Sequence, residues 1–205
     1  MFRQLLYPFL VYRSFFYPFF VLSAITVPCW LIVRLVWLRT RRQPLSVGHE
    51  LLLVISILYL SGLASATLSP NHGGRARADA ARAIELRPNL ASLTCSAAAL
   101  PAGSKARFFC GHNAVGNVLL FIPLGILLPL VWSRLRFRTG MQIAIALSVS
   151  VELLQYLSRV WGSYRLADVN DVILNGVGAG LGLVLVNVLR WRPATAITAS
   201  AEGGR

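Results

Sequence analysis

The residues best suited to chemistry in this chain lie between positions 152 and 175, between and inside two hydrophobic segments. This run holds three of the seven acidic residues of a chain whose formal net charge is +13. A charged side chain at the centre of a membrane helix costs roughly 2.5–3.5 kcal/mol on insertion scales, so such residues usually mark a functional site. The site residues predicted from this run are Glu152, Gln155, Arg159, Arg165, Asp168, Asp171 and Asn175.

Their spacing is helical. Asp168, Asp171 and Asn175 stand at i, i+3 and i+7, so they share one arc of a helix surface. The preceding segment carries a stripe at i, i+4, i+7 and i+11, formed by Ser148, Glu152, Gln155 and Arg159. A third stripe opens with Asn113 and Asn117. Lipid leaves polar groups unsatisfied, so the three stripes are expected to face one another and form a polar pocket.

The chemistry that these residue types support is acid–base or anion-binding chemistry. Glu152, Asp168 and Asp171 are the catalytic candidates: Glu152 as a general acid or base, the two aspartates as holders of a cation or a proton. Arg159 and Arg165 suit a phosphate or carboxylate, and hydrolysis or transfer at phosphate is the natural reaction class. The remaining predicted substrate-binding residues are Asn113, Asn117, Gln155 and Asn175. No nucleophile is evident, because neither Ser148 nor Ser158 has a histidine nearby.

Three other interpretations stay open. In the first, the polar residues only cross-link helices, through hydrogen bonds worth about 0.6 kcal/mol each. A non-catalytic membrane partner or structural protein would use the same residues to hold a ligand or another protein. A small proton-coupled transporter would use Glu152 and Asp171 as carriers, and would need assembly into an oligomer because the chain shows no internal repeat.

The elements that must position these residues are membrane helices. Of the 205 residues, 56% are hydrophobic and 13% are charged, too apolar for an ordinary soluble domain. Five segments approach the ~17–25 residues that a spanning helix needs: Phe15–Leu38, Leu51–Leu68, Val115–Trp132, Met141–Leu157 and Val169–Leu189. The expected fold is an all-α, polytopic transmembrane helical bundle with about five spanning helices.

Arginine placement predicts the orientation. Arginines cluster in the short turns after the first and third hydrophobic segments and at the start of the C-terminal tail. They are Arg39, Arg41 and Arg42, then Arg134, Arg136 and Arg138, and finally Arg190 and Arg192. Arginine-rich short turns stay in the cytoplasm, so the N-terminus is expected outside and the C-terminus inside. Scattered arginines beside membrane helices are explained by anionic lipid headgroups, and nucleic acid is rejected as a partner.

The segments also divide the chain. Residues 1–50 are expected to hold an interfacial lead-in and the first spanning helix, residues 51–190 the main membrane domain with an outer loop at 69–113, and residues 191–205 a disordered tail. Cys95 and Cys110 lie in the outer loop, where a disulfide would contribute about 3 kcal/mol by loop entropy; two free thiols are the alternative. With three histidines and no CxxC spacing, no metal or other cofactor is expected.

At these residues the chain resembles the VanZ-like family of small bacterial membrane proteins, named for a member tied to glycopeptide resistance. Four pieces over about residues 51–189 carry the resemblance: Thr67-Leu-Ser-Pro70, Asn117-Val-Leu-Leu-Phe121-Ile-Pro123-Leu-Gly125, Glu152-Leu-Leu-Gln155, and Arg165-Leu-Ala-Asp168-Val-Asn-Asp171-Val-Ile-Leu-Asn175-Gly176. It implies a multi-pass protein of the inner (plasma) membrane and, by analogy, a link to the cell envelope and antibiotic resistance. The expected partner is therefore a membrane lipid, or a lipid-linked or glycopeptide-related envelope ligand.

Overall fold

The computed structural model describes residues 13–42, 46–68, 86–89, 93, 95, 104–158 and 167–190. Within them the chain forms five long helices and no β-strand: α2 (Arg13–Arg41), α3 (Val47–Leu68), α5 (Lys105–Val131), α6 (Phe137–Leu157) and α7 (Val169–Arg190). Each is long and apolar enough to cross a membrane. The all-α fold and the five spanning helices predicted from hydropathy are confirmed.

The helices are longer than the hydrophobic segments that predict them. The clearest case is α5, which begins at Lys105 rather than at Val115. Hydropathy marks only the part of a helix that lies in hydrocarbon, whereas backbone hydrogen bonding continues into the interface. As a result, Cys110 and Asn113 lie on α5.

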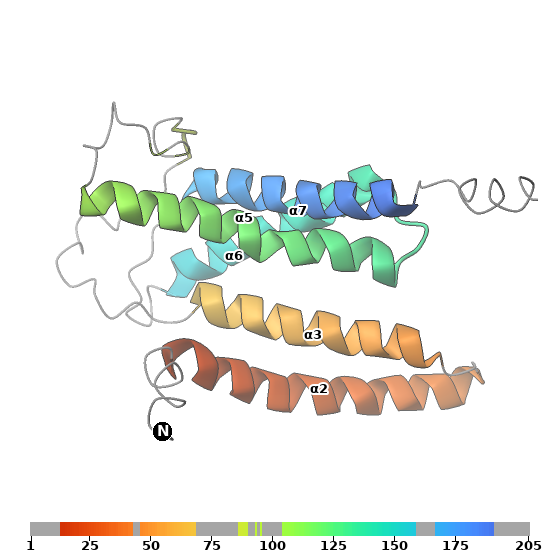
Figure 1. The fold of residues 1–205 in the computed structure, drawn as a ribbon. Helices are drawn as coiled ribbons and strands as arrows, with labels where there is room; N and C mark the ends of the chain where they lie inside the picture. Colours follow the sequence, from red (N-terminus) through yellow and green to blue (C-terminus); the bar gives the residue numbers. More distant parts are fainter. Residues whose placement is uncertain are drawn as a thin grey trace, which may run out of the picture.

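The helices form a hairpin joined to a three-helix group (Figure 1). Helix α2 packs mainly against α3, while α3 also contacts α5 and α6, and α5, α6 and α7 pack on one another. Helices α5 and α7 are parallel, and both begin at the end of the bundle where α3 and α6 finish. We call this the polar end, because nearly all of the buried polar residues lie toward it: Ser65, Thr67, Ser148, Glu152, Gln155, Asn170 and Asn175.

Direct backbone contact joins α5 to α7 beyond this polar end. A Cβ atom added at Gly178 would collide with the carbonyl group of Val118, and one added at Gly182 would collide with the carbonyl group of Ile122. In turn, a Cβ atom at Gly125 would collide with the carbonyl group of Ala179. Small residues let membrane helices approach this closely, which increases their van der Waals contact. The inner part of the α5–α7 interface is therefore apolar and tightly packed.

An ion pair fastens α2 to α3 at the opposite end. The Arg34 guanidinium donates hydrogen bonds to both carboxylate oxygens of Glu50, from Nε at 3.0 and 2.9 Å and from Nη2 at 2.8 Å. It also lies over the ring of Trp37, 4.6 Å from the centroid. From the sequence alone, Arg34 is a long side chain near the end of the first hydrophobic segment that can extend to the interface. The partner was missed because Glu50 precedes the predicted hydrophobic segment.

We expect Arg34→Ala to lower the membrane abundance of the protein several-fold, because Glu50 then lacks its cation beside a spanning helix. Exchanging the two charges, Arg34→Glu with Glu50→Arg, should restore most of the membrane abundance. Quantitative immunoblots of membrane fractions measure the effect, with the exposed Arg39→Ala as control. Equal abundance of the Arg34 and Arg39 variants would contradict a folding role for the pair.

Candidate functional site

Two carboxylates organise the start of α7. Asp168 precedes the helix, and its Oδ1 accepts a hydrogen bond from the backbone N–H of Asn170 at 2.8 Å, as a helix-capping residue does. The backbone N–H of Asp168 donates to Glu152 Oε2 at 3.0 Å. Glu152 lies on α6 and its side chain is only 7% exposed. This buried carboxylate therefore connects α6 to the first turn of α7.

A second contact joins α5 to the same turn. Asn113 Nδ2 donates to Asp171 Oδ1 at 3.1 Å. Asp171 is the acidic residue in the first turn of α7, where the partial positive charge of a helix N-terminus favours an anion. Asn113 and Asp171, which the stripes placed on different helices, are thus direct neighbours.

One turn further from the polar end, two amides have atoms without partners. Asn175 is 3% exposed, and its Nδ2 donates to Ser148 Oγ at 2.9 Å. Asn175 Oδ1 is buried without a hydrogen-bond partner, and so is Asn117 Nδ2 on α5. Most buried polar atoms in proteins are hydrogen-bonded, so such atoms need an explanation.

Gln155 extends toward a helix that the stripes did not include. Its Nε2 donates to the backbone carbonyl of Thr67, near the end of α3, at 2.8 Å. Ser65 and Thr67 of α3 are also buried, at 1% and 8% exposure. The polar end is therefore built by four helices, whereas the sequence predicted three.

Two predicted residues, Arg159 and Arg165, lie outside the described residues. Asn170 was missed, as Ser65 and Thr67 were: it is 3% exposed, and its Oδ1 accepts a hydrogen bond from the backbone N–H of Asn89 at 3.0 Å. Asn170 lies off the stripe of Asp168, Asp171 and Asn175, so helical spacing did not select it. This contact holds the segment of residues 86–89, between α3 and α5, against the start of α7.

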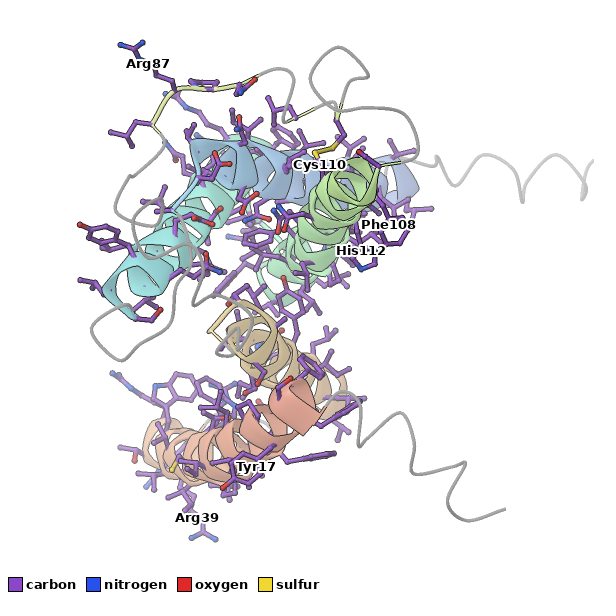
Figure 2. All side chains as sticks on the ribbon, turned by 90° about the vertical axis from the view of Figure 1, so that its left-hand side faces the viewer. Tyr17, Arg39, Arg87, Phe108, Cys110 and His112 are labelled. Carbon is purple, nitrogen blue, oxygen red and sulfur yellow. A yellow bond between two sulfur atoms is a disulfide. The ribbon has the colours of Figure 1, made fainter. Side chains whose placement is uncertain are left out.

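The chain between α3 and α5 is also tied to α5 itself. Cys95 and Cys110 form a disulfide, visible near the start of α5 in Figure 2, which looks onto the polar end. His112 points away from the bundle, is exposed, and stacks on Phe108 with ring centroids 6.0 Å apart. In the described part of the chain, no three His, Cys, Asp or Glu side chains are grouped as metal ligands would be.

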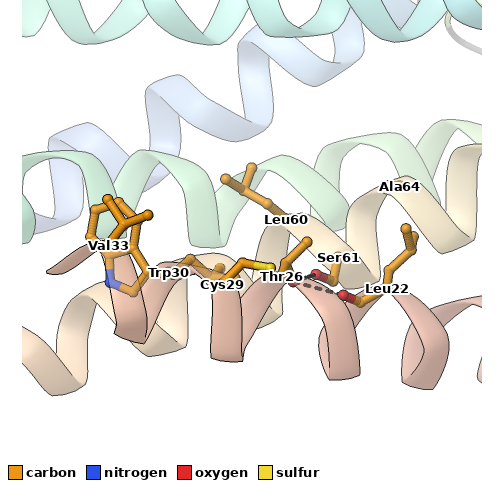
Figure 3. A pocket seen from close by; sticks show the side chains of 9 residues that line it. Leu22, Thr26, Cys29, Trp30, Val33, Leu60, Ser61 and Ala64 are labelled. Atoms are coloured by element: carbon orange, nitrogen blue, oxygen red, sulfur yellow. Dashed lines mark hydrogen bonds between the residues drawn. The ribbon is translucent and has the colours of Figure 1, made fainter. Parts of the chain in front are cut away.

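Two apolar grooves lie away from these polar residues. The larger, about 520 Å³, runs between α2 and α3. Within it Thr26 and Ser61 share a hydrogen bond of 3.2 Å (Figure 3). The other, about 430 Å³, lies between α6 and α7 and includes Gly176 and Gly180. Neither groove is lined by a predicted site residue.

Comparison with known proteins identifies one family and one curated relative. Residues 49–190 match the pattern of the VanZ/LLP1 family. Among curated proteins, Protein VanZ of Enterococcus faecium is 34% identical over 74 residues, which are 36% of this chain and 44% of that protein. The aligned part is thus less than half of that relative's length. No solved structure matches the chain.

Proposed function

Because this chain belongs to the VanZ/LLP1 family, we propose that its polar end binds the headgroup of a lipid-linked component of the cell envelope. The observation that carries this proposal is the pair of buried amide atoms without partners, Asn117 Nδ2 and Asn175 Oδ1. Helices that only cross-link one another have no need of such atoms, since each buried unsatisfied group costs about 1–3 kcal/mol. A bound ligand would satisfy both.

The proposed location is the outer leaflet of the plasma membrane, with the N-terminus outside and the C-terminus in the cytoplasm. The disulfide of Cys95 and Cys110 supports this orientation, because disulfides persist in oxidising compartments. So do the arginines at the opposite end, among them Arg39 and Arg41 in the last turn of α2 and Arg190 in that of α7.

Binding is better supported than covalent catalysis. Among the described residues, Ser148 is bonded to Asn175 and His112 stacks on Phe108, so neither forms part of a nucleophile–base pair. If the bound ligand reacts, Glu152 is the residue we assign to proton transfer, because its buried carboxylate lies beside Asp168. Hydrolysis or transfer at a phosphate is the corresponding reaction class.

A non-catalytic structural or partner-binding protein is the second candidate. It is favoured by the hydrogen bonds that the site makes within the chain, such as Gln155 to Thr67 and Asn113 to Asp171. In that case the polar end would hold four helices together and present the outer loop to another protein.

Removing the negative charge of Glu152 or Asp171 distinguishes headgroup binding from a structural or partner-binding role. Glu152→Gln keeps an oxygen that can accept from the Asp168 N–H, and Asp171→Asn keeps one for Asn113. We expect both variants to fold yet to retain at least about tenfold less lipid, because hydrogen bonds to charged groups contribute about 1.5–3 kcal/mol. Native mass spectrometry of the purified protein counts the bound lipid, and glycopeptide susceptibility of expressing cells provides a second measurement.

Asn187→Ala is the control, since Asn187 is an exposed amide at the other end of α7. It should leave both measurements unchanged. If Glu152→Gln and Asp171→Asn lose membrane abundance as much as they lose lipid, the polar end is structural and the binding function is wrong.

A further inference from the structure

The two partnerless amide atoms, Asn117 Nδ2 and Asn175 Oδ1, lie at the same depth on neighbouring helices. Helices α5 and α7 are parallel, and Asn113 of α5 is bonded to Asp171 of α7. Asn117 and Asn175 follow these residues by four positions in each helix, which is about 6 Å along both axes. The same register brings Gly178 against Val118 immediately beyond them. The donor Asn117 Nδ2 and the acceptor Asn175 Oδ1 are therefore at the same depth.

Exchanging the oxygen and nitrogen of the Asn175 amide does not give both atoms a partner. Ser148 Oγ can either accept or donate a hydrogen bond, so exchanging the oxygen and nitrogen of Asn175 would only leave its nitrogen without a partner. Ser148 is fully buried and already bonded to this amide. One atom of the Asn175 side chain stays open in both assignments.

The chemistry of the open atoms selects their partner. A hydroxyl group both donates and accepts, so one hydroxyl would satisfy Asn175 Oδ1 and Asn117 Nδ2 together. An ammonium group only donates, and a phosphate or carboxylate only accepts. An anion is disfavoured further by Glu152 and Asp171, whose carboxylates lie about one turn away.

We propose that Asn117 and Asn175 form a subsite for a single hydroxyl of an uncharged, polyhydroxylated lipid headgroup, such as a sugar. This inference rests on the proposed function and specifies its ligand: the part of the headgroup that enters the bundle is neutral. An ordered water has the same hydrogen-bonding chemistry, and a direct Asn117–Asn175 hydrogen bond would also satisfy both atoms, so the test separates the sugar hydroxyl from these two alternatives.

The probes are a monoglucosyl diacylglycerol and its counterpart with a fully O-methylated glucose, each in nanodiscs of phosphatidylcholine. The methylated sugar can accept hydrogen bonds but cannot donate one to Asn175 Oδ1. We expect the protein to prefer the free sugar by about tenfold or more in native mass spectrometry. Asn117→Leu should reduce this preference to near one while the melting temperature stays equal or rises, because a partnerless buried amide has been removed.

Asn187→Leu, at an exposed position of α7, is the matched control and should keep the preference. If Asn117→Leu lowers the melting temperature and leaves the preference unchanged, the pair binds a water or bonds directly, and the subsite is wrong. If the unaltered protein shows no preference for the free sugar over the methylated one, the subsite is also wrong. The proposed function is tested separately, by the lipid that the Glu152→Gln and Asp171→Asn variants retain. Asn175→Leu provides a second variant should Asn117→Leu fail to fold.

Discussion

Replacing Gly178 by leucine is expected to eliminate the folded bundle. Even a Cβ atom at this position would collide with the carbonyl group of Val118, and a backbone carbonyl in a helix cannot rotate away. Gly178→Ala should therefore lower the stability by about 1–3 kcal/mol, as overpacking does, and the larger leucine should leave little monodisperse protein. Size-exclusion chromatography and thermal melting in detergent measure both variants.

Gly176 provides the control, two residues away on the same helix. A Cβ atom there meets no atom within 4 Å, because this glycine borders the groove between α6 and α7. Gly176→Ala should be neutral or stabilising by up to about 1 kcal/mol, the usual difference between glycine and alanine inside a helix. Equal losses at Gly176 and Gly178 would contradict the close α5–α7 contact.

An all-or-none difference is expected when the two loop cysteines are labelled. In intact cells a membrane-impermeant maleimide should leave Cys95 and Cys110 unmodified, because they form a disulfide. After an impermeant reductant is added outside, both should react. Opening this bridge, whose cysteines are 15 residues apart, should also lower stability by about 3 kcal/mol, the value for a loop of this size in the entropy model.

Cys29 is the internal control for this experiment. It is a free cysteine on α2, within a spanning segment, and an impermeant reagent should not reach it through lipid. Labelling of Cys110 only in inverted vesicles would reverse the proposed orientation. Labelling from outside without a reductant would contradict the disulfide.

Much of the fold follows from hydrophobic length alone. Five apolar segments become five helices, because a spanning segment must satisfy its backbone hydrogen bonds internally and a helix does so locally. Helical periodicity likewise relates Asp168, Asp171 and Asn175, and Asp171 and Asn175 do face their predicted neighbours. What the sequence does not specify is which helices are neighbours, so it predicted neither Gln155 bonding to Thr67 nor Arg34 pairing with Glu50.

Side-chain direction is a second property that the hydrophobic pattern does not specify. Of the glycines at 176, 178, 180 and 182, only Gly178 and Gly182 touch α5. Successive residues of a helix point about 100° apart, so alternate glycines divide between two faces. Asp168 also caps α7, a structural role that its position before the helix could have indicated, whereas its role in holding a cation or a proton stays a prediction.

The close pairing of α5 and α7 also determines which parts of the protein can move. The pair is joined at one end by Asn113 and Asp171, and at the other by Arg190, which donates to the carbonyl groups of Pro129 at 2.6 Å and Ser133 at 3.3 Å. Two helices fastened at both ends and in backbone contact between them behave as one rigid body. If the polar end binds a ligand as proposed, we expect its entry to displace α3 or α6 rather than α5 and α7, and to break the Gln155–Thr67 or Glu152–Asp168 contact.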